Sequence, residues 1–209
     1  MSIVGYTSSK VGTLGHRKSK RFGWFYLTRI RGGYWMKHDQ LFLTGVERYF
    51  DDTEIIVSKT DTKGRITYAN DVFLRVAGYS EKQLLGQPHS IIRHPDMPRC
   101  VFSLLWETVA AGREIFAYVI NRCANGDHYW VLANVTPTIG RDGKIIGYHS
   151  NRRVPRRDAL KQVIPLYAAL CEEEEKERNR KEGMARSTAK LGALLADAGI
   201  DYDQFVFTL

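Results

Sequence analysis

The chain has 209 residues, of which 44% are hydrophobic and 26% are charged, and its formal net charge is +8. This composition is typical of a soluble globular protein whose core needs no disulfides. Three cysteines, Cys100, Cys123 and Cys171, lie far apart without a CxxC pair. Their spacing argues against a disulfide framework and against a cysteine zinc site.

No stretch of about 18 apolar residues occurs in the chain, so a membrane-spanning helix is not expected. The apolar run from Phe22 to Leu27 is too short, and Arg29 and Arg31 follow it. It also lacks the small-residue cleavage site of a secretory signal. We therefore expect a cytoplasmic protein.

The excess positive charge lies entirely in residues 1–38. This segment contains 8 basic residues and no acidic one, whereas residues 39–209 carry 23 residues of each sign. We expect a basic extension that is an unstructured leader or, if Met36 is the true initiator, a non-native start. A basic arm also suits nucleic acid or an anionic membrane surface. No helix-turn-helix pattern accompanies it, so a nucleic-acid partner is not expected.

Short strand and helix patterns alternate in the middle of the chain. Two β-prone runs, residues 55–60 and 66–69, flank a Lys-Gly turn and predict a hairpin. Residues 70–77 carry apolar side chains at helical spacing, and Gly78 can end this helix.

Two more helices are expected before the next strands. Ser80 followed by Gln83 is a capping-box pattern that predicts a single helical turn. Residues 98–111 predict the longest helix of this region, with Gly112 at its end. Pro98 lies near its start, where a missing N–H costs little.

Three long strands are expected after this helix. The first two, residues 115–124 and 127–138, flank an Asn-Gly pair, which is a strong signal for a two-residue hairpin turn. An Asp-Gly pair gives a second such signal before a strand over 144–152. The three strands should form an antiparallel meander joined to the first hairpin. This order predicts an α+β domain over residues 45–155, with a five-stranded antiparallel sheet and short helices on one face.

Residues 156–209 have helical patterns and are expected to form C-terminal helices. Apolar residues repeat at 3–4 spacing from Leu160 to Leu170, and Pro165 should kink this helix. Four glutamates follow at 172–175, and Glu172, Glu174 and Glu177 each have a basic residue at i,i+4 (Lys176, Arg178 and Lys181), which is typical of an exposed helix.

The end of the chain predicts a further helix. Gly183 should interrupt the preceding helix, and leucines before Gly199 mark a short helix that this glycine caps. The tail over 205–207 is too apolar to be left in water, so we expect it to dock back on the protein.

Four pieces of the chain resemble the sensory PAS domain of bacterial aerotaxis receptors. They are DTKGRITYAND (61–71), VAGYSEKQLLGQPHSIIRHPDMP (76–98), NGDHYWVLANVTP (125–137) and IPLYAAL (164–170). The Arg-His-Pro-Asp-Met-Pro and Asn-Gly-Asp-His-Tyr-Trp runs are specific within PAS domains. The resemblance covers about 120 of the 209 residues.

The resemblance implies a PAS fold with a non-covalently bound FAD that senses redox state or oxygen. It also implies signalling to a membrane chemoreceptor or transducer protein. The receptors carry a hydrophobic segment and a signalling module that this chain lacks, so it is more similar to stand-alone PAS partners. A homodimer is compatible with this interpretation.

Asparagines on two adjacent strands are the first candidate cofactor contacts. The pyrimidine edge of a flavin alternates donors and acceptors, and an Asn carboxamide offers both. Asn121 and Asn134 lie on the strands before and after the Asn-Gly turn, so both are expected on the helix-covered face. The resemblance assigns both positions to the pocket. The alternative is that they face solvent.

Arg93, His94 and Asp96 lie just before the longest helix of the domain. Arg93 suits an anionic cofactor group, because guanidinium pairs well with phosphate. The resemblance makes all three residues important for holding FAD. The structural alternative is that Asp96 caps the helix and that His94 packs against Trp106.

Two aromatic side chains and one further asparagine complete the candidate site. Phe102 and Trp106 are one helical turn apart and either stack on the flavin ring or belong to the ordinary core. The resemblance ties Asn70 to cofactor binding, although this residue can equally cap the helix that follows it.

Other chemistries find little support in the residues. His94 is a candidate axial haem ligand, but its Pro95 neighbour and its loop position disfavour that role. The remaining histidines show no metal spacing. Cys100 lies outside the segment where light-sensing flavin domains carry their reactive cysteine. No nucleophile–base motif, P-loop or paired-carboxylate arrangement is found, so an enzyme is not expected.

The chain departs from the receptors at two positions of the predicted pocket. The receptors carry Trp and Gly where this chain has Ile115 and Ala117. The alternatives to FAD are therefore a smaller flavin, another ligand or a pocket without cofactor. In the last case the PAS core would be a docking and dimerisation module.

Overall fold

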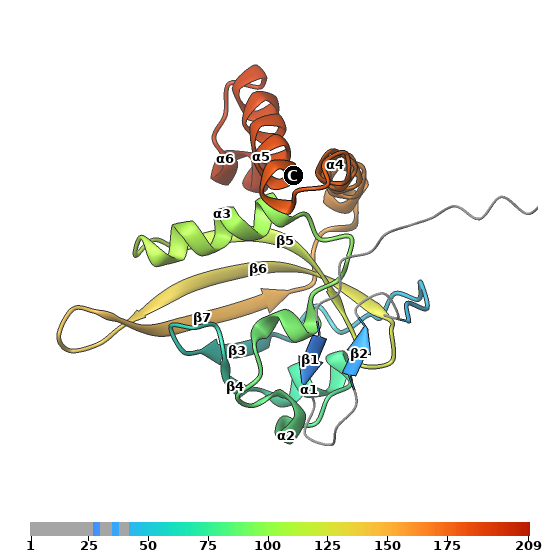
Figure 1. The fold of residues 1–209 in the computed structure, drawn as a ribbon. Coiled ribbons are helices and arrows are strands. Elements are labelled where there is room, and N and C mark those ends of the chain that lie inside the picture. Colours follow the sequence, from blue (N-terminus) through green and yellow to red (C-terminus); the bar gives the residue numbers. More distant parts are fainter. Residues whose placement is uncertain (1–26, 30–34, 38–41) are drawn as a thin grey trace, which may run out of the picture. The chain divides into compact units, whose positions relative to one another are not determined.

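The computed structural model describes residues 27–29, 35–37 and 42–209 (Figure 1). The chain divides into two units, residues 1–41 and 42–209. In the first unit, β1 (Leu27–Arg29) and β2 (Trp35–Lys37) form an antiparallel pair. Apart from this pair, the basic extension expected over residues 1–38 lies outside the described residues.

The second unit is built around a five-stranded antiparallel sheet with the strand order β4-β3-β7-β6-β5 (Figure 1). The strands are β3 (Ile56–Thr60), β4 (Ile66–Ala69), β5 (Ile115–Arg122), β6 (His128–Ile139) and β7 (Ile145–Arg153). Because β7 pairs with both β6 and β3, the meander joins the first hairpin. The predicted fold class is confirmed.

Both hairpins of the meander have three-residue loops, one residue longer than predicted. The backbone N–H of Cys123 donates to the carbonyl of Asp127 at 2.7 Å, and that of Gly140 donates to Lys144 at 2.8 Å. Each loop ends in a glycine with a positive φ, 92° at Gly126 and 77° at Gly143. This geometry is typical of a type I turn followed by a left-handed residue.

Four short helices connect the two parts of the sheet. They are α1 (Asp71–Ala77), α2 (Glu81–Leu84), the 3₁₀ helix η2 (His89–Ile92) and α3 (Arg99–Ala110). The predicted capping box is present, because the Gln83 side chain accepts from the backbone N–H of Ser80 at 2.9 Å. Helix α3 begins one residue later than predicted, with Pro98 as its N-cap residue.

One face of the sheet, the inner face, carries Tyr148 and Arg152 and lies against α1 and α3. The ring of Trp106 in α3 packs edge-on against Tyr148, with 5.3 Å between ring centres. The guanidinium of Arg152 lies 4.5 Å from the ring centre of Phe73 in α1. In Figure 1, α3 runs along β5 and β6, and α1 lies near β3. The inner face is therefore the predicted helix-covered face.

The opposite, outer face packs against the C-terminal helices α4 (Arg157–Glu175) and α6 (Tyr202–Thr208). The hydroxyl of Tyr167 in α4 donates to the carbonyl of Tyr118 in β5 at 2.6 Å. In α6 the ring of Phe207 lies 4.8 Å from that of Phe116. The apolar tail thus docks back on the protein, as predicted.

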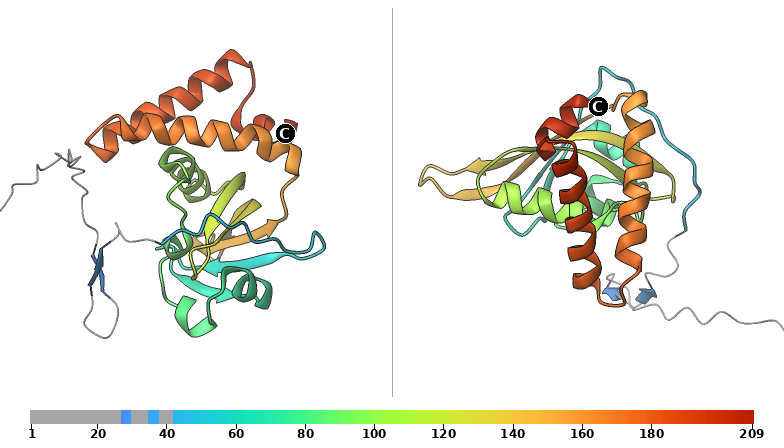
Figure 2. Two further views of the ribbon diagram at one scale, coloured as in Figure 1. Left: turned by 90° about the vertical axis from the view of Figure 1, so that its right-hand side faces the viewer. Right: turned by 90° about the horizontal axis from the view of Figure 1, so that it is seen from above.

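Helix α4 and helix α5 (Arg180–Asp197) run side by side as a helical hairpin (Figure 2). The sequence predicts an exposed glutamate cluster here, but Glu173 and Glu174 are buried. None of the expected i,i+4 pairs is among the ion pairs of the described residues. Glu174 instead binds Arg99 in α3, because the side of α4 that carries Glu174 packs against the domain.

The predicted interruption at Gly183 does not occur, because Gly183 lies inside α5. Pro165 lies inside α4, which continues on both sides of it. A Cβ at Gly183 would come within 2.3 Å of the Glu174 carbonyl oxygen, so glycine allows the two helices to approach closely. No helix in the described part of the chain is both long and apolar enough to cross a membrane.

Candidate functional site

The register of β5 and β6 separates the two candidate asparagines. Asn121 lies opposite Tyr129, and Asn134 lies opposite Phe116. Because directly paired residues share a face and faces alternate along a strand, Asn121 is on the inner face and Asn134 on the outer face. The prediction that both share the helix-covered face is therefore wrong.

The loop length explains this error. A two-residue turn would pair Ala124 with Asp127 and would bring Asn121 and Asn134 to one face. The observed three-residue loop pairs Cys123 with Asp127, which shifts the register by one residue. The side-chain amide of Asn134 instead donates a hydrogen bond to the carboxylate of Glu114 at 3.0 Å.

The inner face carries an unusual group of buried polar atoms. Six buried side-chain polar atoms in the described part of the chain lack a hydrogen bond, and five of them belong to this face. They are Thr60 Oγ1, Asn121 Nδ2, Tyr129 Oη and both Nε and Nη1 of Arg152. Buried polar groups are normally satisfied, so a group without partners indicates a site for a polar ligand or water.

Arg152 dominates the electrostatics of the inner face. It is 2% exposed, and no ion pair joins it to a carboxylate among the described residues. Its Nη2 donates to the hydroxyl of Ser58, and its guanidinium stacks on Phe73. Burying a charge is costly unless it is paired. The inner face thus presents a positive charge and several donors to any ligand that enters it.

Burial and the charge of Arg152 also set the protonation state of His89, at the start of η2. Burial, and then the nearby Arg152, lower the pKa of His89 to about 3. His89 is therefore neutral near pH 7, with its Nε2 at 3.5 Å from the hydroxyl of Ser58. Burial similarly raises the pKa of Tyr129, which stays a neutral hydroxyl.

Apolar side chains form the rest of the inner face. Ile115 and Ala117 lie on the same face as Asn121, because all three alternate along β5. Both are buried. The two pocket positions named above as departures from the receptors therefore lie on the inner face.

Asn70 is a structural cap. Its Oδ1 accepts from the backbone N–H of Val57 at 2.9 Å and of Phe73 at 3.1 Å, and its Nδ2 donates to the carbonyl of Ile55 at 2.8 Å. These three hydrogen bonds join α1 to β3 and the residue that precedes β3.

Arg93 lies next to the inner face but points its guanidinium away from the polar group. Its backbone pairs with that of Asn121, while its guanidinium lies 4.7 Å from the ring centre of Phe102. Its Nη2 donates to the carbonyl of Met97 at 3.2 Å. Arg93 thus connects the inner face with the surface of α3.

His94 and Asp96 do not adopt the predicted structural roles. The ring of His94 packs against His128, not Trp106, with 5.6 Å between ring centres. Its Nδ1 accepts from the backbone N–H of Asp96, and burial lowers its pKa, so it is neutral. The Asp96 side chain is 76% exposed, and Pro98 occupies the N-cap of α3. His94, the alternative haem ligand, therefore has a ring nitrogen already engaged.

A groove of about 370 Å³ lies between α3 and α5. Phe102 and Trp106 from α3 and Met184 from α5 form its apolar part. Four basic residues also line it, namely Arg93, Arg99, Arg180 and Lys181. The two predicted aromatic residues thus lie at this groove, with Trp106 also contacting the inner face through Tyr148.

Sequence reasoning missed Arg152, Tyr129 and Glu174. The first two could have been found from the strand pattern once the register was known, because they share a face with Asn121. No local signal marks Glu174 as buried. Within the described residues, no group of three or more His, Cys, Asp and Glu side chains could hold a metal ion.

Residues 46–150 match the family model described as the PAS fold. The chain belongs to the PAS family. The PAS match includes β3 to β6, most of β7 and helices α1 to α3, and it ends two residues before Arg152.

Over this PAS domain the chain is related to sensory and regulatory proteins. It is 48% identical to the aerotaxis receptor of Escherichia coli strain K12 over 120 residues, which are 57% of this chain and 23% of the receptor. It is 32% identical to a nitrogen fixation regulatory protein of Klebsiella pneumoniae over 124 residues, which are 59% of this chain and 24% of that protein. The chain therefore spans less than a quarter of the length of these curated relatives.

Among solved structures, the PAS domain is similar to the blue-light photoreceptor Aureochrome1 LOV in its dark form. The identity is 24% and the TM-score 0.47, and the match covers 53% of this chain and 82% of the other.

Proposed function

We propose that this protein is a cytoplasmic, non-catalytic PAS sensor that binds FAD on its inner face and reports redox state or oxygen to a membrane chemotaxis transducer. In this proposal residues 45–155 form the sensor, and residues 156–209 form the segment that contacts the partner. The observation that carries it is the group of unpartnered polar atoms around the buried Arg152.

The residues of the inner face fit the chemistry of a flavin ring. The pyrimidine edge of the ring alternates carbonyl acceptors and N–H donors, which suits the carboxamide of Asn121. Arg152 adds donors on Nε and Nη1, and Tyr129 adds a hydroxyl. Ile115 and Ala117 supply apolar contact for the ring. An oxygen-rich ring would also offer acceptors to Nε and Nη1 of Arg152, which have no hydrogen bond among the described residues.

A bound flavin would supply reversible uptake of electrons and protons at this site. The neutral His89 leaves Arg152 as the charged group that would stabilise added negative charge there. Arg152 lies in β7, which leads directly into α4. Asn121 lies in β5, whose Tyr118 carbonyl accepts from Tyr167 of α4. Small shifts of either strand would therefore move the C-terminal helices.

The first test is the absorption spectrum of the freshly purified full-length protein, with the released chromophore identified after heating. Flavin absorption with FAD released supports the proposal. Protein that is colourless and does not take up added flavin would overturn it. That result would favour the alternative, a cofactor-free docking and dimerisation module.

A matched pair of variants locates the flavin. Asn121→Ser should weaken flavin binding about tenfold or more, because the ring loses a buried hydrogen-bonding partner. Asn134→Ser, the same change on the outer face of the adjacent strand, should leave flavin affinity unchanged. Equal effects of both variants on the flavin dissociation constant would contradict an inner-face site.

A further inference from the structure

The groove between α3 and α5 collects positive charge from two parts of the chain. Arg93 and Arg99 come from the PAS domain, whereas Arg180 and Lys181 come from the first turn of α5. Burial chiefly lowers the pKa of Arg93, and the charges of Arg180 and Arg99 lower it further, while Glu174 acts in the opposite direction. Because all four cations line one groove, an anion bound there would relieve the repulsion between them.

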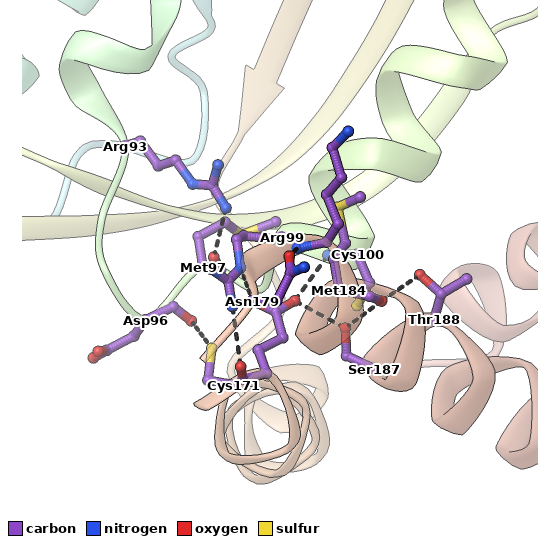
Figure 3. A network of polar contacts seen from close by, with 12 residues as sticks. Arg93, Asp96, Met97, Arg99, Cys100, Cys171, Asn179, Met184, Ser187 and Thr188 are labelled. Carbon is purple, nitrogen blue, oxygen red and sulfur yellow. Dashed lines mark hydrogen bonds and ion pairs between the residues drawn. The ribbon is translucent and has the colours of Figure 1, made fainter. Parts of the chain in front are cut away.

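The carboxylate of Glu174, which lies near these cations, already accepts hydrogen bonds from other groups. Glu174 accepts from Arg99 Nε at 2.7 Å, from the backbone N–H of Cys100 at 3.0 Å and from the hydroxyl of Ser187 at 2.9 Å. Figure 3 shows Arg99, Cys100 and Ser187 converging at this junction. Glu174 also acts on the charge of Arg93, and the residues that line the groove include four basic side chains and no acidic one.

The apolar part of the groove suits a flat aromatic group. The guanidinium of Arg93 lies over one side of the Phe102 ring at 4.7 Å. Trp106 follows one turn later on α3, and Met184 faces them from α5. Aromatic and guanidinium planes stack well on the base of a nucleotide, and the cations beside them suit its phosphates.

We propose that this groove binds the diphosphate and purine of an adenine nucleotide, and that α5 supplies one wall of the site. The nucleotide is either the adenosine diphosphate half of FAD or a free adenine nucleotide. The first source rests on the flavin function proposed above, because the backbone pairing of Arg93 with Asn121 places the groove beside the inner face. The second source does not depend on flavin.

The site is formed only when the C-terminal hairpin lies on α3. The Glu174 contacts and the close approach at Gly183 fix the first turn of α5, and so fix Arg180 and Lys181, beside the PAS domain. The N-terminus of an 18-residue helix adds its own preference for anions. Nucleotide binding would therefore stabilise the docked position of the hairpin.

The test uses the full-length protein and three ligands. ADP binding is measured by calorimetry, and the affinities of FAD and riboflavin are compared by flavin fluorescence, since riboflavin lacks both phosphates. Lys181→Gln removes a groove cation, and Lys161→Gln makes the same charge change on the exposed side of α4, outside the groove.

Two outcomes support the proposal. In one, FAD binds at least tenfold more tightly than riboflavin, and Lys181→Gln but not Lys161→Gln reduces this ratio, by about tenfold. In the other, ADP binds, including to protein that takes up no flavin, and the same variant weakens it. The first identifies the cofactor as the source, and the second identifies a free nucleotide.

Equal affinities for FAD and riboflavin together with no ADP binding would overturn the proposal. Equal sensitivity to Lys181→Gln and Lys161→Gln would do so as well, because it would indicate a general charge effect. If no flavin binds but ADP does, the flavin function fails and the groove site stands. If FAD and riboflavin bind equally well and ADP does not bind, the flavin function stands and the groove site fails.

Discussion

The side chain of Glu174 in α4 accepts a hydrogen bond from the backbone N–H of Cys100 in the first turn of α3, over 3.0 Å. These residues are 74 positions apart in the chain. Helix α3 has no side-chain cap of its own, because Pro98 occupies the N-cap. A carboxylate from the C-terminal hairpin therefore does the work of a cap and binds Arg99 as well. The PAS domain and the hairpin are linked by a partly buried ion pair.

Removing the charge of Glu174 should destabilise the protein. We expect Glu174→Gln to lower the free energy of unfolding by about 3 kcal/mol, because Arg99 and the α3 N-terminus lose a buried ionic partner. Glu172→Gln on the exposed side of the same helix should change it by less than about 0.5 kcal/mol. Urea unfolding measures both. Similar values for the two variants would show that the buried pair adds no stability.

Two glycines of α5 should respond to alanine in opposite directions. Gly192→Ala should stabilise the protein by about 1 kcal/mol, since nothing lies within 4 Å of the new Cβ and alanine favours a helix. Gly183→Ala should destabilise it, because its Cβ would lie 2.3 Å from the Glu174 carbonyl oxygen. Thermal melts give the sign of each change. A stabilised Gly183→Ala would mean that the hairpin is not packed as described.

The buried Arg152 should be unfavourable for stability and favourable for ligand binding. In flavin-free protein, Arg152→Met should be as stable as the wild type or more stable, by up to about 4 kcal/mol, because a buried unpaired charge is replaced by an apolar chain. Its flavin affinity should fall at least about tenfold.

Arg153→Met, at the next residue and on the outer face, is the control for Arg152→Met and should change neither property. Chemical unfolding and flavin titration measure the two effects. Strong destabilisation of flavin-free Arg152→Met would indicate that this charge already has a partner in the folded chain.

His89 should make stability depend on pH below neutrality. Its folded-state pKa, about 3, is depressed below the ordinary value of 6.5 by burial and by Arg152. Its contribution is therefore complete above about pH 6.5 and is lost as the pH falls toward 3, because the unfolded state takes up the proton first.

We expect the wild type to lose stability more steeply than His89→Gln between about pH 7 and pH 4.5. His149→Gln, on the outer face of β7, should follow the wild type. Unfolding curves at several pH values would decide this. Parallel curves for wild type and His89→Gln would exclude a His89 whose pKa is depressed in the folded protein.

The sequence by itself determined most elements of the PAS domain and their ends. The cap at Asn70, the capping box at Ser80, the left-handed Gly78 and both hairpins lie within one or two residues of their predicted positions. These features depend on contacts between residues close in the chain, whose backbone chemistry can be read directly. The order of the elements then restricted the topology to the observed five-stranded sheet.

Only the tertiary structure decided which side chains form the site. One extra loop residue after Cys123 moved Asn134 to the outer face and left Asn121 beside Arg152 and Tyr129. The glutamate cluster has the local pattern of an exposed helix, yet Glu174 is buried because α3 supplies Arg99 and a free helix N-terminus. Strand register and helix docking depend on partners dozens of residues away, and short-range patterns carry no information about those partners.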